Sequence, residues 1–183
     1  RINRDGSGPE DNPYADRGMP GAAVWSYGHR NPQGLVVDPK TSIVYQHEHG
    51  PQGGDEVNRI EPGLNYGWPA ICWGIDYNGA RISPYTELPG MEQPLIYWVP
   101  SIAPSGMAIY RGDRFPEWDG NLFVGALVDK EVRRLVLEDG VIVEEQALFS
   151  DLEERIRDVR VSPDGYLYLV TDSDQGRILR VER

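Results

Sequence analysis

Three features are scarce in this sequence: cysteine, positive charge and long hydrophobic runs. Cys72 is the only cysteine among 183 residues, which excludes an internal disulfide. The 18 lysines and arginines are outnumbered by 29 aspartates and glutamates, giving a formal net charge of −11. Nucleic acid is not expected as a partner, because phosphate binding requires a basic patch; the acidity fits either an ordinary soluble surface or the binding of cations. No segment is apolar enough to be predicted to span a membrane.

Glycine, proline and aromatic residues are abundant. The chain has 21 glycines, 15 prolines, ten tyrosines and five tryptophans, a composition typical of short strands joined by many turns. No segment has a convincing helical period, and the nearest candidate, residues 144–154, is expected to form a loop or one short turn. The polar opening at Arg1, without a methionine or a signal peptide, indicates the middle of a longer protein or a processed product.

One unit recurs three times along the chain: an apolar strand, a turn rich in Asp, Pro and Gly, an aromatic strand and a third strand. The third copy is the clearest, because Pro163-Asp164-Gly165 supplies the turn between two strands. Repeated antiparallel units predict an all-β fold of the β-propeller kind with about three blades. A β-sandwich also uses short strands and turns, but it does not require repetition of the whole unit.

Three blades are too few to close a propeller, which needs at least four. An open set would leave sheet faces and edges unprotected. We therefore expect residues 1–183 to form part of a larger ring, completed by a missing half of the protein or by a second chain. Residues 63–105 form a long inter-strand insertion, and their aromatic density predicts an ordered loop.

Polar side chains gather in the stretch Gly28–Leu35. Arg30 offers five donors in a fixed geometry that suits a carboxylate or a quinone oxygen. Asn31 is held extended because Pro32 follows it. The alternative is a polar turn in which Arg30 pairs with a surface acid.

A second polar stretch, residues 47–56, contains histidines and carboxylates. His47 and His49 lie on one face of a predicted strand as a candidate metal pair, but no third soft ligand is in range. The glycine-rich loop with Asp55 and Glu56 better suits a hard cation such as Ca²⁺. A glycine-rich turn before an edge strand with surface acids explains the same residues equally well.

Two arginines near the C-terminus, Arg155 and Arg157, are predicted to share one strand face. Two guanidinium groups pointing the same way can grip an anionic ligand with several carboxylates. Taken alone, the pair fits a solvated strand face beside Glu153, Glu154 and Asp158 better.

Six motifs together resemble one family, the soluble PQQ-dependent aldose sugar dehydrogenases of the glucose/sorbosone dehydrogenase group. They occur in the family's order and cover the chain from about Trp25 onward. The motifs are Gly28–Leu35, His49–Glu56, Asn65–Pro69, Ser101–Gly106, Asn121–Ala126 and Ile156–Gly165. The resemblance implies the C-terminal half of a six-bladed propeller that binds PQQ and Ca²⁺ and oxidises aldose sugars at C1 to lactones, in the periplasm or outside the cell. A non-catalytic propeller that binds sugars or protein partners is the alternative, because fold does not determine function.

The resemblance also implies which residues would contact the two ligands. The positions that match PQQ contacts are Arg30 and Asn31 at its quinone, Tyr77, Ser101, and Arg155 and Arg157 on its carboxylates. The positions that match Ca²⁺ ligands are the carbonyls of Gly50 and Pro51 for the ion that bridges to PQQ, and Glu56 and Tyr66 for a second, structural ion.

Two departures from the family pattern stand out. The family's catalytic histidine, its general base, matches no residue of this chain, and strand alternation turns His29 away from Arg30. A lysine that contacts PQQ in the family is replaced by Val128. Lys130 is expected on the same strand face, where it either substitutes for that lysine or leaves PQQ affinity reduced.

Overall fold

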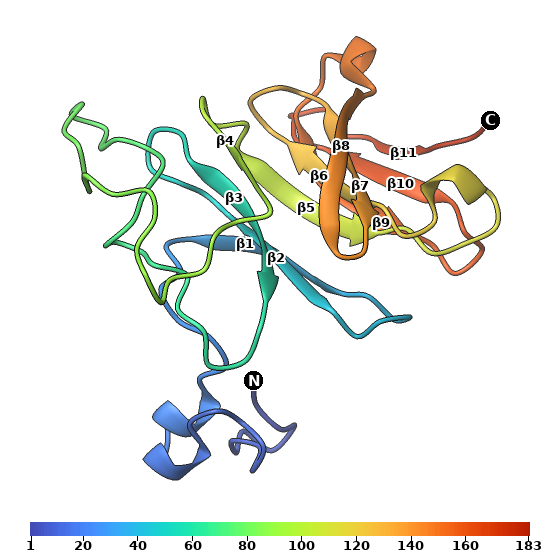
Figure 1. Cartoon of the computed structure of the whole chain (residues 1–183). Helices are drawn as coiled ribbons and strands as arrows, with labels where there is room; N and C mark the ends of the chain where they lie inside the picture. The colour runs from blue at the N-terminus through green and yellow to red at the C-terminus, as the bar shows by residue number, and fades with distance from the viewer.

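The structure, a computed structural model that describes all 183 residues, contains three antiparallel sheets (Figure 1). Sheet 1 consists of β1 (Pro32–Val37), β2 (Val44–Glu48), β3 (Asp55–Ile60) and β4 (Ile96–Trp98). Sheet 2 consists of β5 (Pro104–Ile109), β6 (Leu122–Ala126), β7 (Val132–Glu138) and β8 (Val141–Leu148). Sheet 3 consists of β9 (Ile156–Val161), β10 (Leu167–Thr171) and β11 (Ile178–Arg180).

Helical structure is limited to four short 3₁₀ turns. They are η1 (Ala15–Arg17), η2 (Gly21–Ala23), η3 (Pro116–Trp118) and η4 (Ser150–Leu152). A helix both long and apolar enough to cross a membrane is not found in the structure.

The three sheets are blades of a propeller. Within each sheet the strands follow their order in the sequence, and neighbouring strands are antiparallel. β1 packs beside β5, and β5 packs beside β9, so the first strands of the three sheets lie next to one another (Figure 1). Meanders that meet along their first strands are the arrangement of propeller blades around an axis. The prediction of an all-β partial propeller is confirmed.

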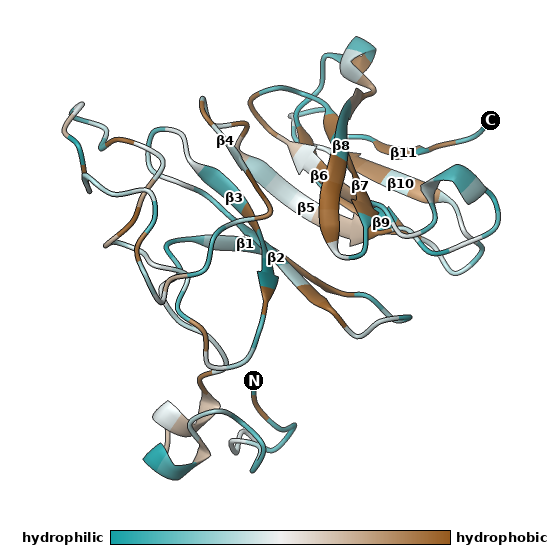
Figure 2. Ribbon diagram, in the orientation of Figure 1, coloured by the Kyte–Doolittle hydropathy of each residue, from teal (hydrophilic) through white to brown (hydrophobic).

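The middle blade is buried on both faces, because β6 supplies two cores. Leu122 and Val124 join Tyr45 of sheet 1 in one core. Phe123 points the other way and joins Val159 of sheet 3 in the second core. Successive side chains of a strand face opposite sides, so a strand buried on both faces needs a continuous apolar run. Figure 2 shows hydrophobic residues concentrated in the strands around β6, β7, β9 and β10, with mostly hydrophilic loops.

An ion pair between the half-buried Arg111 and the buried Asp38 joins sheets 1 and 2 where β1 and β5 end. Arg111 Nε lies 3.0 Å from Asp38 Oδ1, and its terminal nitrogen lies 2.7 Å from Oδ2. The Arg111 guanidinium holds the pKa of Asp38 well below its usual range. The pair fixes how the two blades pack at this end of the molecule.

The sheets contain two strands that the sequence pattern did not predict. Residues 144–148 belong to β8, so the expected loop over 144–154 is wrong there, although η4 supplies the short turn. β8 is an edge strand with most residues exposed, and Glu144 and Glu145 hide its alternation. β4 lies inside the predicted insertion 63–105 and pairs with β3 through Asp55 opposite Trp98, so this segment completes sheet 1.

Candidate functional site

The starts of the three innermost strands meet at one end of the molecule. Arg30, just before β1, donates to the carbonyl of His49 at 2.9 Å. The His49 ring bonds to the carbonyl of Pro104, the first residue of β5, at 2.6 Å. Ser105 Oγ donates to the carbonyl of Ile156, the first residue of β9, at 2.6 Å. The last two hydrogen bonds connect segments more than fifty residues apart, and all three lie at the end of the propeller where the predicted site residues gather.

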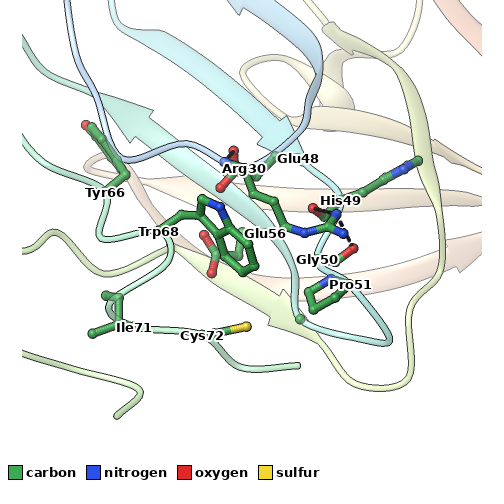
Figure 3. Close-up of a pocket in the computed structure, with 11 residues that line it drawn as sticks. Arg30, Glu48, His49, Gly50, Pro51, Glu56, Tyr66, Trp68, Ile71 and Cys72 are labelled. Carbon is green, nitrogen blue, oxygen red and sulfur yellow. Dashed lines mark hydrogen bonds between the residues drawn. The ribbon is translucent and has the colours of Figure 1, made fainter. Parts of the chain in front are cut away.

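A small, acidic cavity lies at this end (Figure 3), with about 270 Å³ of free space that includes solvent at its mouth. Its main polar and aromatic lining residues are Arg30, Glu48, Glu56, Tyr66 and Trp68. Glu48 and Glu56 are direct partners across β2 and β3. Burial, with a further contribution from the Glu48 charge, raises the pKa of Glu56 to about 7. The cavity therefore holds two facing carboxylates, of which Glu48 also lies 3.7 Å from Nδ1 of His29.

The donor set of the acidic cavity fits a hard cation. Asn58, on the same face of β3 as Glu56, has a buried side-chain oxygen with no hydrogen-bond partner. The carbonyl of Tyr66 also accepts no hydrogen bond. Oxygen donors of this kind suit Ca²⁺. No cluster of three or more His, Cys, Asp or Glu side chains forms a metal site, so an ion here would need carbonyl or amide oxygens as well.

A larger, open cavity adjoins the acidic one and shares His49, Gly50 and Pro51 with it. It encloses about 1080 Å³, including solvent space at its mouth, which is enough for a small organic ligand. Tyr77 and Ser101 line it too. Four predicted ligand-contacting residues, from three separate segments of the chain, therefore lie around one cavity.

Asp55 holds the walls of the open cavity together, a role that the sequence analysis missed. Its buried carboxylate accepts from the backbone N–H of Gly50 at 3.0 Å, from Ser101 Oγ at 2.5 Å and from the N–H of Ala103 at 3.0 Å. The expectation that Asp55 joins Glu56 as a cation ligand is wrong for Asp55, because neighbouring strand residues face opposite sides. That alternation was the available signal.

The two carbonyls expected to hold Ca²⁺ differ in their surroundings. Arg30 donates to the carbonyl of Gly50 at 2.7 Å, whereas the carbonyl of Pro51 accepts no hydrogen bond. Arg30 also donates its backbone N–H to Glu48 at 3.0 Å, and its guanidinium lies 5.3 Å from the centre of the Trp68 ring. Figure 3 shows this guanidinium between the Trp68 ring and the carbonyls of His49 and Gly50, to which it donates. An ion at Gly50 would have to share that oxygen with Arg30.

The arginine pair of sheet 3 is oriented by an acid. Arg155 and Arg157 both donate to Asp172, which follows β10. The side chains of the two arginines are 45% and 49% exposed, so each guanidinium is open to solvent. The acids beside them in the sequence, Glu153, Glu154 and Asp158, pair with neither arginine.

Four predicted PQQ contacts line neither cavity: Asn31, Lys130, Arg155 and Arg157. Asn31 is exposed, and its side-chain oxygen accepts from Gln33 at 2.9 Å. β6 ends at Ala126, so Val128 and Lys130 lie in the loop before β7 and the shared strand face predicted for them is wrong. Lys130 has a φ of 57°, which turns the chain between the two strands. Both side chains are exposed to solvent.

The histidines of this region form no metal pair. β2 ends at Glu48, so His49 lies beyond the strand. His47 is fully buried against Gly34, and burial lowers its pKa to about 4. The His29 ring stacks on Tyr66 at 4.6 Å, and its Nε2 lies 2.8 Å from Ser26 Oγ.

The whole chain matches one family of enzymes. Residues 1–180 match the family model described as Glucose / Sorbosone dehydrogenase. The chain belongs to the glucose/sorbosone dehydrogenase family. It is 45% identical to aldose sugar dehydrogenase YliI of Escherichia coli (strain K12), over 99% of this chain and 49% of the relative. Quinoprotein glucose dehydrogenase B of Acinetobacter calcoaceticus is 29% identical, over 94% of this chain and 47% of the relative.

Solved structures of this dehydrogenase family have the same fold. A glucose dehydrogenase structure is 50% identical and covers 100% of this chain and 54% of its own, with a TM-score of 0.93. The PQQ-bound aldose sugar dehydrogenase of Streptomyces coelicolor is 30% identical and covers 98% of this chain and 50% of its own, with a TM-score of 0.74. The chain spans about half the length of the curated relatives it matches.

Proposed function

We propose that the protein containing this chain oxidises aldose sugars at C1 to lactones, with PQQ and Ca²⁺ as cofactors. The observation that carries the proposal is the meeting of predicted ligand residues at one end of the propeller. Gly50 and Pro51 line both adjoining cavities, and Arg30 lines the acidic one. Tyr77 and Ser101 complete the open cavity. Family membership and the PQQ-bound relative support the same chemistry.

The open cavity and the arginine pair suit a quinone that carries three carboxylates. When bound, PQQ supplies the two-electron oxidant for the sugar. Arg30 would donate to its quinone oxygens, and Arg155 and Arg157 would neutralise its carboxylates. Tyr77, whose side chain is 73% exposed, would supply an aromatic surface, and Ser101 a hydroxyl at the wall. Asn31 and Lys130, which are both exposed, would contact PQQ from the surface.

The proposal includes two calcium sites, each made of oxygen donors. The carbonyls of Gly50 and Pro51 would hold one ion beside the open cavity. Glu56 and Tyr66 would hold the second ion in the acidic cavity, with Glu48 close enough to share its charge. Placing Ca²⁺ there would remove the cost of burying two facing carboxylates.

We place the general base of the reaction outside this chain. His47 and His49 are engaged in packing and in a backbone contact, and His29 lies against Tyr66. The base would come from the missing half of the propeller or from a second chain. The apolar surface that such a partner would cover includes Leu35 and Val37 of β1, both exposed. A periplasmic or secreted location, as for a sugar-oxidising enzyme, is part of the proposal.

The test uses the protein that contains this chain. Purified protein is incubated with PQQ and Ca²⁺, and dye reduction is measured with glucose as substrate. We expect turnover that disappears in an Arg155→Ala, Arg157→Ala double variant together with the absorbance change on PQQ addition. Absence of that change in the wild-type protein would favour a non-catalytic propeller that binds sugars or proteins. Robust turnover by residues 1–183 alone would contradict a base outside the chain.

A further inference from the structure

We propose that Asp172 is a positioning residue that holds Arg155 and Arg157 in one orientation for the carboxylates of PQQ. The inference rests on the proposed function and extends it to a residue that no motif of the sequence marked. Asp172 lies just beyond β10, whereas the two arginines lie at the start of β9. These three residues, Arg155, Arg157 and Asp172, form a trio that bridges two strands of sheet 3.

Three hydrogen bonds converge on a single oxygen of Asp172. Arg155 approaches Oδ2 with Nε at 3.0 Å and with a terminal nitrogen at 2.9 Å. Arg157 approaches the same oxygen with a terminal nitrogen at 2.9 Å. The backbone N–H of Asp172 donates to the carbonyl of Arg155 at 2.8 Å, which ties the acid to the strand that carries the arginines. Without the acid between them, the two cations would repel each other.

The trio suits ligand binding better than stability. Exposed ion pairs add little to the free energy of unfolding, because solvent screens them and ordering long side chains costs entropy. Each arginine has five N–H donors, and only three of the ten are used on Asp172, which leaves seven for another partner. The trio carries a net charge of +1, so it still attracts an anion. Ordering the arginines in advance lowers the entropy lost when a ligand binds.

The test separates positioning from charge by comparing Asp172→Asn with Glu154→Gln. Glu154 precedes Arg155 but pairs with Arg177, at 2.7 Å, so its loss removes one nearby negative charge and leaves the trio intact. The dissociation constant for PQQ is measured with Ca²⁺ present by tryptophan fluorescence quenching, on the protein that contains this chain. If Asp172 acted only through its charge, both variants should bind PQQ more tightly than the wild-type protein does. If Asp172 positions the arginines, Asp172→Asn should bind PQQ about tenfold more weakly, whereas PQQ binding by Glu154→Gln should not weaken.

A third variant, Asp172→Glu, guards against a folding defect. It keeps the charge but moves the carboxylate by one methylene, so positioning predicts weaker PQQ binding than in the wild-type protein. Thermal unfolding midpoints should stay close to the wild-type value for all three variants. Equal or tighter binding by both Asp172 variants would overturn the inference while leaving the proposed function standing. Failure of the wild-type protein to bind PQQ would overturn the proposed function, and this inference with it.

Discussion

The carboxylates of sheet 1 differ in behaviour because their neighbours differ. Asp55 is fully buried but accepts three hydrogen bonds, whereas Glu56, one residue on, accepts a single weak one from Asn58 at 3.3 Å. Glu56 also faces Glu48. Burial without compensating donors favours the protonated form, so the pKa of Glu56 is raised.

We predict that Glu56→Gln stabilises the metal-free protein above pH 7. The wild-type pKa is raised from 4.5 to about 7, so the folded state keeps its proton where the unfolded state loses it. The contribution of Glu56 to the wild-type free energy of unfolding is therefore fully present below pH 4.5 and is lost as the pH rises to about 7. Glu56→Gln should not show this pH-dependent loss, so its free energy of unfolding at pH 8 should exceed that of the wild-type protein by about 1–3 kcal/mol. Urea unfolding in EDTA from pH 4 to pH 8 measures it.

With calcium present, we expect the wild-type protein to be more stable than Glu56→Gln at pH 8. Added Ca²⁺ should raise the unfolding midpoint of the wild-type protein at pH 8 and change that of Glu56→Gln far less, because the variant lacks the carboxylate ligand. Parallel pH profiles without metal, or equal responses to Ca²⁺, would contradict the assignment of Glu56 to a cation site.

At the scale of elements, the loop between β2 and β3 is shaped by how closely its backbone packs. A Cβ added at Gly50 would lie 2.1 Å from the carbonyl oxygen of Gly53, a distance that real side chains do not reach. Asp55 ties the same loop to the segment before β5. The loop thus forms one wall of both cavities without room for a side chain at its start.

We predict that Gly50→Ala displaces this loop. The clash should lower the free energy of unfolding by about 1–3 kcal/mol and weaken PQQ binding at least about tenfold. Gly79→Ala is the matched control: its φ of 84° makes alanine strained, but no atom lies within 4 Å of the added Cβ. The control should cost about 1 kcal/mol and leave PQQ binding unchanged. Thermal unfolding and fluorescence titration of both variants decide the matter, and equal PQQ affinities would rule out the loop as a wall of the site.

At the scale of the whole molecule, the blades are joined by apolar cores and by an ion pair whose acid is buried. The two cores lie on either side of sheet 2, with β6 contributing to both. Asp38, only 2% exposed, receives two hydrogen bonds from Arg111 across the junction of sheets 1 and 2. Arg111 is 23% exposed and also pairs with Asp119 at 3.0 Å, so the buried carboxylate of Asp38 depends on this contact more than the arginine does.

We predict that Asp38→Asn destabilises the fold by about 1–3 kcal/mol at pH 7. Because the pKa of Asp38 is lowered in the folded state, the wild-type advantage is present above its ordinary value of 3.8 and is lost as the pH falls below that value. Glu61→Gln, which removes the partner of Arg59 in an exposed pair, should cost under about 0.5 kcal/mol. Chemical unfolding at pH 7 and pH 3 measures both, and a deficit of Asp38→Asn that persists undiminished at pH 3 would count against this account.

Local conformations and the order of the blades can be read from the amino-acid sequence alone. Pro163-Asp164-Gly165 turns the chain wherever it lies, and Leu122–Ala126 is apolar on both faces because both are buried. Partnerships between distant segments are set by the three-dimensional packing instead. β4 joins sheet 1 from 35 residues beyond β3, Asp55 binds residues more than forty positions away, and Asp172 pairs with arginines on another strand. Such contacts depend on sheet register and blade packing, which place residues side by side without any signal in the sequence near them.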